Sequence, residues 1–427
     1  MLVQGYIKKN STSSYCSEVM YMYCGNNWSY FRSHVYHLRR GLSMLLPPTE
    51  DGIAAAAKRI QENRLVSFPT ETVYGLGANA LSEDAVSSIF RAKKRPQSNP
   101  LIVHVPDKKY ALPLGIFKKN EYEIFNSLTN RFWPGPLTLV VKASSLVPRA
   151  VTAGTGFVGL RCPNHPIALA LLRACGMPLA APSANLSGSV SPTTANHVMS
   201  DFVHGDVGVI DGSMGCCKHG IESTVAKIDG GRYTVTILRE GSVTKNNILD
   251  SMNTEQRDVW EVVSDPKYIS STSPIAAGEE SPGQGMTHYS PALPSYIVSK
   301  IRVLNNDGGV DSTETVDNKT LSTAVVLDFG QRLVSLKDKV LAYKDLSLNG
   351  DPADAARNLF AAMRWADKVD NACVIIFADP SRSADGRTDI AAEPVFSETI
   401  APALMDRIYR ATSGSRRNIS IRQCSSS

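Results

Sequence analysis

Short apolar runs alternate with segments of helical periodicity along most of the chain, and this alternation constrains the fold more than any other feature. The run 65–68 has the length of a buried strand, and the segment before it, 51–63, repeats apolar residues at helical spacing. After the strand, Ser82 is expected to cap a helix that runs to about Lys93. Further strands are expected at 101–105, 137–141, 157–160, 179–181, 207–210, 224–228 and 234–238, and further helices at 119–131 and 166–174. This order predicts an α/β domain.

The last strands of this domain follow one another without a long helix between them, which predicts a mixed, twisted sheet instead of a regular doubly wound one. Ser, Thr, Pro and Gly then dominate, as in a linker. A second α/β unit follows, with a polar insertion near 305–318. Asp351 is expected to cap a helix in it, with Ala356, Leu359, Phe360 and Met363 as the buried stripe. The division is an extension (1–45), a first α/β domain (46–250), a linker (251–295), a smaller α/β domain (296–412) and a tail expected to be disordered (413–427).

The net charge of +5 is concentrated at the N-terminus, where the first 45 residues hold five basic side chains and a single acidic one, Glu18. The remaining chain is close to neutral, so it carries no general charge signature of nucleic-acid binding. An acid-poor leader containing Arg and Ser is typical of an organelle transit peptide. A disordered extension is the alternative, and Met44 could be the true start. We therefore expect a cytoplasmic protein, with import into mitochondria or another organelle as an open possibility.

The eight cysteines show neither a C-x-x-C pair nor zinc-ligand spacing with a histidine. This pattern predicts a reduced protein with no structural metal. No apolar run approaches the roughly 20 residues that a membrane-spanning helix needs, so we expect a soluble chain.

Three predicted strands lie next to clusters of polar side chains. The strand 65–68 is followed by Pro69-Thr70-Glu71-Thr72 and the strand 179–181 by Pro182-Ser183-Ala184-Asn185, while Glu222-Ser223 precedes the third. Each cluster could be an ordinary polar turn. Hydroxyl groups gathered at strand ends are also how a fold presents polar groups to a small molecule. Taken together, they predict a nucleotide site beside a site for a small polar substrate.

Cationic side chains lie beside this predicted site. The run 91–95 places Arg and Lys side chains at a helix C-terminus, where they could simply complement the helix dipole or could bind phosphates. Arg161 ends a strand, and a buried guanidinium there needs an anionic partner, either a substrate carboxylate or a protein Asp or Glu. His104 is expected on the sheet face opposite Leu101 and Val103. A single histidine in a strand is more often structural than catalytic.

The motifs together resemble the YrdC-type L-threonylcarbamoyladenylate synthases. The matching stretches are 67–76, Lys93 to Pro96 with Asn99-Pro100-Leu101, 132–138, 182–185 and 222–225, in the same order and at similar spacing. Ser281-Pro282-Gly283 and His288-Tyr289-Ser290-Pro291 resemble the linker of the two-domain form, and 296–412 fits its C-terminal domain more loosely. The resemblance implies a twisted mixed-sheet YrdC-like domain with a concave site, followed by a smaller Rossmann-like α/β domain.

The resemblance also implies a reaction and its site residues. L-Threonine, bicarbonate and ATP, with Mg²⁺, would give L-threonylcarbamoyl-AMP and pyrophosphate, and a downstream transferase complex would pass the threonylcarbamoyl group to tRNA beside the anticodon. The implied catalytic residues are Lys93 and Arg95. The implied threonine site is Thr72, His104, Arg161, Ala181 and Ser223. The implied ATP site is Arg95, Asn99, Ser183, Ser191, Arg239 and Tyr289, with no protein-held metal, and the linker that carries Tyr289 would act as a lid.

Two other classes of function remain open. A concave fold with a cationic run could be a double-stranded RNA-binding module, and a weak contact with tRNA is compatible with the enzyme as well. The domain could also act on carbamoyl phosphate as part of a larger maturation enzyme, although no acylphosphatase-like or zinc-finger stretch accompanies it.

Overall fold

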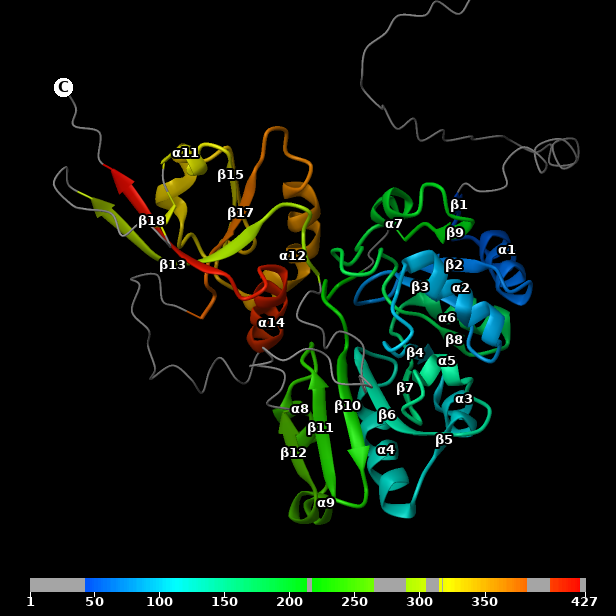
Figure 1. Ribbon diagram of the computed structural model, residues 1–427. Coiled ribbons are helices and arrows are strands. Elements are labelled where there is room, and N and C mark those ends of the chain that lie inside the picture. Colours follow the sequence, from blue (N-terminus) through cyan, green and yellow to red (C-terminus); the bar gives the residue numbers. More distant parts are fainter. Residues whose placement is uncertain are drawn as a thin grey trace, which may run out of the picture. The chain divides into compact units, whose positions relative to one another are not determined.

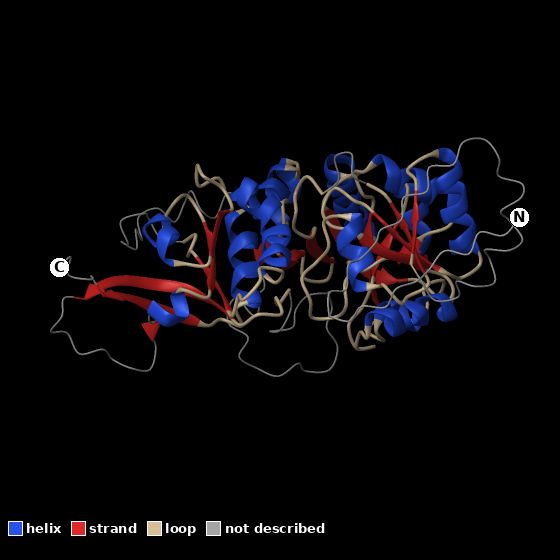
Figure 2. Ribbon diagram, turned by 90° about the horizontal axis from the view of Figure 1, so that it is seen from above, coloured by secondary structure: helices blue, strands red, loops and turns tan. Residues whose placement is uncertain are grey.

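The computed structural model describes residues 43–212, 217–264, 289–304, 315–316, 318–381 and 400–422. They form two domains, each built on one β-sheet with helices packed against it (Figures 1 and 2). The expected α/β fold class is confirmed in both domains. No helix among these residues is long and apolar enough to cross a membrane.

The N-terminal domain contains a 12-stranded mixed sheet with the order β1-β9-β2-β3-β8-β4-β7-β6-β10-β11-β12, and β5 pairs with β6. Parallel pairs such as β4–β7 alternate irregularly with antiparallel pairs such as β6–β7, which confirms the expected mixed sheet. The strands are β1 (Met44–Leu46), β2 (Leu65–Phe68), β3 (Gly75–Asn79), β4 (Ile102–His104), β5 (Gly115–Ile116), β6 (Leu137–Ala143), β7 (Phe157–Arg161), β8 (Leu179–Ala180), β9 (Val207–Ile210), β10 (Thr224–Asp229), β11 (Thr234–Arg239) and β12 (Glu261–Ser264).

Several helices of this domain begin at a residue whose side chain accepts a hydrogen bond from a free N–H group of the first turn. The Ser82 hydroxyl accepts a hydrogen bond from the Ala85 amide, and Thr49 caps the first helix in the same way. Pro166 occupies the first turn of α6, where no N–H is needed. The helices are α1 (Glu50–Gln61), α2 (Glu83–Lys93), α3 (Lys108–Ala111), α4 (Lys119–Phe132), α5 (Arg149–Thr152), α6 (Pro166–Cys175), α7 (Ala195–Asp201), α8 (Lys245–Asp250) and α9 (Thr254–Val259), with a 3₁₀ turn at Leu112–Leu114.

Alternating side chains of one strand enter different apolar clusters because successive residues point to opposite faces of the sheet. In β4 and its flanks, Leu101, Val103 and Val105 join the main core, whereas Ile102 joins a small separate cluster. His104 shares the face of Ile102, as expected from the sequence. Both faces of the sheet are therefore covered here, and a polar side chain on this strand is removed from bulk water.

The C-terminal domain contains a six-stranded, all-parallel sheet with the order β14-β18-β13-β17-β15-β16. Asp351 caps its long helix, and Leu359, Phe360 and Met363 form the buried stripe expected from the sequence. The elements are β13 (Ser295–Leu304), β14 (Thr315–Val316), β15 (Ala324–Asp328), β16 (Ala342–Asp345), β17 (Val374–Phe377), β18 (Arg416–Arg422), α11 (Asn318–Leu321), α12 (Pro352–Ala366) and α14 (Ala401–Ala411), with a 3₁₀ turn at Val334–Lys339.

Several expected boundaries are wrong. The glycine-rich stretch after the threonines is strand β3, because its backbone pairs with β2. The part of the expected linker up to Ser264 contains α9 and β12, and β12 adds to the first sheet by pairing with β11. The expected disordered tail contains β18, which pairs with β13. The expected extension overlaps β1, which pairs with β9. The extension up to residue 42, linker residues 265–288 including His288, and most of the polar insertion (305–314) lie outside the described residues.

A close backbone contact joins the two domains at Gly220. A Cβ built on Gly220 would lie 2.3 Å from the Arg357 Cα and 2.6 Å from the Ala356 carbonyl oxygen, both in α12. Gly220 also has a φ of +69°, which disfavours other residues. Only glycine lets the loop before β10 approach helix α12 this closely.

We expect Gly220→Ala to destabilise the protein by more than its backbone conformation explains. Gly176→Ala is the matched control, because Gly176 has a φ of +67° and nothing lies within 4 Å of its Cβ position. A left-handed backbone costs about 1–2 kcal/mol in either variant. The clash with α12 adds about 1–3 kcal/mol for Gly220→Ala alone. Urea unfolding midpoints measure the difference, and equal losses in the two variants would contradict the close contact.

Candidate functional site

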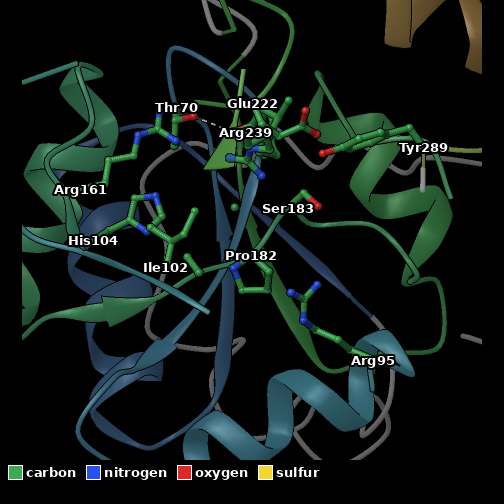
Figure 3. A pocket seen from close by; sticks show the side chains of 14 residues that line it. Thr70, Arg95, Ile102, His104, Arg161, Pro182, Ser183, Glu222, Arg239 and Tyr289 are labelled. Carbon is green, nitrogen blue, oxygen red and sulfur yellow. Dashed lines mark hydrogen bonds between the residues drawn. The ribbon is translucent and has the colours of Figure 1, made fainter. Parts of the chain in front are cut away.

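Strand ends from across the first sheet line one pocket (Figure 3). β4 and β7 run parallel and end at His104 and Arg161, while Arg239 ends β11. Ala181, Pro182 and Ser183 follow β8, and Thr70 follows β2. The complete lining is Thr70, Val73, Tyr74, Gly75, Arg95, Ile102, His104, Arg161, Ala181, Pro182, Ser183, Glu222, Arg239 and Tyr289.

The pocket is narrow in this conformation. The space among its side chains is about 40 Å³, which is room for a few water molecules. Pockets that hold drug-sized ligands typically measure about 300–1,000 Å³. A nucleotide therefore requires lining side chains to move apart.

Arg161 lies in the most deeply buried polar cluster of the pocket. Its guanidinium donates hydrogen bonds to Glu71 Oε1 at 2.9 Å and to Thr72 Oγ1 at 2.8 Å, and both partners are buried. Thr72 Oγ1 lies 2.9 Å from Thr70 Oγ1 in turn. Of the two anionic partners that the sequence left open for Arg161, the structure contains the protein carboxylate.

Some polar atoms in and beside this buried pair have no hydrogen-bond partner among the described residues. Glu71 Oε2, Arg161 Nε and His104 Nδ1 are buried and have no hydrogen-bond partner among the described residues. Native proteins pair the great majority of such atoms, so several orphans in one place indicate room for a polar ligand. An amino acid carries both the donors and the acceptors that these three atoms lack.

His104 is neutral at physiological pH. Burial, and next the positive charge of Arg161, lower the pKa of His104 to about 3. The ring packs edge-on against Phe68, with centroids 6.0 Å apart. A neutral imidazole has one donor and one acceptor nitrogen, so His104 can orient a ligand without adding charge to the pocket.

Arg95 and Arg239 form the cationic half of the pocket. Arg239 donates to the Ser223 carbonyl at 2.9 Å and to Ser223 Oγ at 3.2 Å, while Arg95 donates to the Pro100 carbonyl at 2.9 Å and to Asn99 Oδ1. Both side chains extend toward Pro182 and Ser183 (Figure 3). Carbonyl and amide oxygens orient the two guanidinium groups. The arrangement suits a phosphate-bearing ligand.

Lys93 supports this region from behind the pocket. Its ammonium group donates to the Ser183 carbonyl at 2.6 Å and to the Asn185 carbonyl, and it is buried. Burial, and next the positive charge of Arg95, hold the pKa of Lys93 well below its usual value. Lys93 is absent from the pocket lining. In this conformation it positions the loop after β8, so its expected catalytic role stays a prediction.

The expected site residues separate into those that line the pocket and those that contact the lining. The lining includes Arg95, His104, Arg161, Ala181, Ser183, Arg239 and Tyr289. Behind the lining, Thr72 contacts Arg161, Ser223 contacts Arg239, and Asn99 contacts Arg95. Ser191 Oγ donates to Glu222 Oε1 at 2.5 Å. The roles assigned to these residues remain predictions, but the structure brings them together.

Sequence reasoning missed Glu71 and Glu222 as site residues, although both belong to the quoted motifs. Glu71 follows Thr70 directly, and a carboxylate within a buried hydroxyl cluster was a signal that a cation must lie opposite it. The lining residues Val73, Tyr74, Gly75, Ile102 and Pro182 were also missed, because apolar and backbone contacts leave no chemical signature in a sequence.

Tyr289 closes the pocket from the far end of the linker. Its ring is buried, stacks on Phe360 of α12 at 5.4 Å, and lies 5.2 Å from the Arg407 guanidinium carbon. Ser290 donates its amide hydrogen to the Gly188 carbonyl at 3.0 Å, which ties the linker to the loop after β8. Tyr289, near the end of the expected linker, therefore belongs to the pocket.

Two family models together match most of the chain. A model described as "Telomere recombination", for Sua5, YciO and YrdC proteins, matches residues 58–241. A model described as "Threonylcarbamoyl-AMP synthase, C-terminal domain" matches residues 243–413. The border between the two matches lies just after β11, close to the expected end of the first domain.

Relatives and solved structures agree with these matches. The threonylcarbamoyl-AMP synthase of Pyrococcus abyssi is 35% identical over 361 residues, which cover 84% of this chain and 94% of the relative. The Bacillus subtilis synthase is 43% identical over 260 residues, 59% of this chain and 68% of the relative. The crystal structure of P. abyssi Sua5 complexed with L-threonine has a TM-score of 0.68 at 31% identity and covers 89% of this chain and 99% of its own. The chain belongs to the two-domain Sua5/YrdC family of threonylcarbamoyl-AMP synthases.

Proposed function

We propose that this chain makes L-threonylcarbamoyl-AMP and pyrophosphate from L-threonine, bicarbonate and ATP. The observation that carries the proposal is the single pocket in which a buried arginine with unpaired polar neighbours lies beside two further arginines. The relatives named threonylcarbamoyl-AMP synthase, and the Sua5 structure with L-threonine bound, favour the same reaction. An amino acid fits the first half of the pocket and a nucleotide phosphate fits the second.

The chemistry needs positioning more than it needs a protein nucleophile. The threonine ammonium group would lose a proton, and the free amine would attack carbon dioxide formed from bicarbonate. Ammonium and bicarbonate together would give the carbamate, one water molecule and one proton released to solvent. A carbamate oxygen would then attack the α-phosphorus of ATP, and pyrophosphate would leave. Holding three reactants in line removes much of the entropic cost of such a reaction. Arg95 and Arg239 would stabilise the charge that develops on the phosphate oxygens.

The threonine half would use the orphaned polar atoms. Arg161 retains an unpaired Nε after its bonds to Glu71 and Thr72, and this donor would face the substrate carboxylate. Neutral His104 would hydrogen-bond the substrate without repelling its ammonium group. Ala181 would complete the wall on this side, and Ser223, which lies behind the lining, would act through its contact with Arg239.

The ATP half would use Arg95, Arg239 and Ser183 directly, with Asn99 and Ser191 orienting the groups that contact the nucleotide. Tyr289 would have to move outward to admit ATP, because the present space is about 40 Å³. Its return would exclude water from the labile adenylate. We therefore propose the linker as a lid.

Magnesium would enter with ATP instead of being held by the protein. Glu222 is the one carboxylate among the lining residues, and both of its oxygens already accept hydrogen bonds. No group of three His, Cys, Asp or Glu side chains in the described ranges could hold a metal ion. Mg²⁺ would offset phosphate charge, and the donor set of this pocket offers it no free carboxylate.

The product would serve a transferase complex that modifies tRNA beside the anticodon, in the cytoplasm or in an organelle reached through residues 1–45. A recessed pocket of this size does not fit a double helix, which makes the double-stranded RNA-binding module the weaker candidate. Weak contact with tRNA elsewhere on the surface is compatible with the enzyme.

Pyrophosphate release tests the proposal directly. The full chain is incubated with Mg-ATP and bicarbonate, with and without L-threonine, and pyrophosphate is measured over time. We expect release that depends on threonine and on bicarbonate. Carbamoyl phosphate replaces bicarbonate in a parallel reaction, and thermal shift with short double-stranded RNA tests the alternative. Release without threonine, or stabilisation by RNA alone, would contradict the proposed function.

Loss of the Arg161 guanidinium should weaken threonine binding while ATP still binds. Arg161→Met is combined with Glu71→Gln, since removing one partner of a buried pair leaves an unpaired charge that costs about 3–5 kcal/mol of stability. A charge-assisted contact is worth about 1.5–3 kcal/mol, so we expect the threonine Kd to rise at least about tenfold. Calorimetric titration measures it, with the exposed Arg173→Met as control. An unchanged threonine Kd in the folded double variant would refute the role of Arg161.

Loss of the Arg95 guanidinium should have the opposite selectivity. We expect Arg95→Met to raise the ATP Kd at least about tenfold, because its proposed partner is phosphate and charge-assisted bonds are the strong ones. The threonine Kd should stay within about threefold, since Arg95 lies in the other half of the pocket. Arg91→Met, an exposed arginine of α2, the helix that ends just before Arg95, is the matched control. Equal losses for both ligands would show that the substitution only disturbs the fold.

A further inference from the structure

Glu222 places a negative charge where phosphate oxygens are expected. It is the only acid among the lining residues, and it shares the pocket with Arg95 and Arg239. Figure 3 shows its carboxylate beside Arg239, on the side of Tyr289. A carboxylate at this position repels a polyphosphate unless a nearby cation offsets it. The proposed ATP site therefore needs a partner for Glu222.

The partner comes from the other domain. Arg407, in α14, donates from Nε to Glu222 Oε2 at 3.0 Å, and its side chain is completely buried. Ser191 occupies Oε1 of the same carboxylate. Arg407 also donates to the Glu240 carbonyl at 2.9 Å, at the end of β11 that carries Arg239. One side chain of the C-terminal domain thus reaches two loops of the nucleotide half.

We propose that Arg407 is a positioning residue of the active site that neutralises Glu222 and thereby allows ATP to bind. The inference rests on the proposed function for its substrate, but it concerns a residue outside the first domain and outside every motif quoted from the sequence. The C-terminal domain then contributes to nucleotide affinity through charge. A domain that only covered the pocket would contribute through packing alone.

A double variant distinguishes an effect of the Arg407 charge on ATP binding from an effect of its packing. Arg407→Met keeps an apolar stem of similar length, but Glu222 loses its ion pair with Arg407 and keeps the Ser191 hydrogen bond, so its charge faces the phosphates. Glu222→Gln in the same protein keeps the shape and the hydrogen-bonding capacity while removing the charge. If Arg407 acts by neutralising Glu222, the second substitution repairs the first. If it acts by packing, the second substitution repairs nothing.

The experiment measures the Kd of Mg-ATP by calorimetric titration, and KM for ATP and for threonine where turnover is seen. We expect Arg407→Met to raise the ATP Kd at least about tenfold, a change of about 1.4 kcal/mol, while KM for threonine stays within about twofold. Arg407→Met with Glu222→Gln should return the ATP Kd to within about threefold of the native value. The matched control is Arg357→Met, because Arg357 donates to the Lys218 carbonyl of the first domain at 3.0 Å and does not line the pocket.

Two results would overturn the proposal: an unchanged ATP Kd in Arg407→Met, or a weakened Kd that Glu222→Gln fails to restore. If the single variant does not fold, the double variant still decides, because Glu222→Gln removes the charge at position 222, and Asp406, which also loses its bond to Arg407, keeps its ion pair with Arg410. Arg407→Lys keeps a positive charge beside Glu222. Near-native ATP affinity in both the folded double variant and Arg407→Lys supports neutralisation, and weak affinity in the double variant excludes it. Native protein that binds ATP but releases no threonine-dependent pyrophosphate would refute the proposed function and leave this comparison intact.

Discussion

The buried pair between Arg161 and Glu71 is the interaction on which the pocket depends. It joins the end of β7 to the turn between β2 and β3, which are distant in the sequence and are not neighbours in the sheet. Losing one partner would leave an unpaired charge in a site from which water is largely excluded, a loss of about 3–5 kcal/mol. The pair therefore restricts the turn to a conformation that keeps Thr70 and Thr72 within reach of Arg161. It also holds a guanidinium where an anionic ligand can reach it.

The same pocket gathers several positively charged side chains, and hydrogen bonds hold them in place. Arg239, Arg95 and Lys93 each donate to backbone carbonyl oxygens, and Arg95 donates to the Asn99 side-chain oxygen as well. These bonds orient the cations. Arg161 donates to the carboxylate of Glu71. One half of the pocket therefore contains a buried ion pair, and the other contains Arg95 and Arg239, each held by hydrogen bonds.

The contacts between the domains extend this arrangement across the chain. Arg407 reaches Glu222, Tyr289 packs between Phe360 and the pocket, and Gly220 allows α12 to approach the loop before β10. Arg364 of the same helix pairs with Asp201 at 2.7 Å. Because Glu222 and Tyr289 line the pocket, a shift of the C-terminal domain changes the pocket itself.

The sequence by itself determined the α/β class, most of the strands, the helix caps at Ser82 and Asp351, and the clusters of polar residues at strand ends. These are local properties, set by periodicity, proline and capping chemistry within a few residues. The sequence did not predict strands β3, β12 and β18. Such glycine-rich or polar segments form strands only when a neighbouring strand supplies hydrogen bonds, and a local pattern does not reveal that neighbour. The sequence also left the partner of Arg161 open, missed Glu222 and gave no signal for Arg407. Those pairings join residues about 90 and 185 positions apart, so only the tertiary structure, which brings distant loops together in one buried pocket, could decide them.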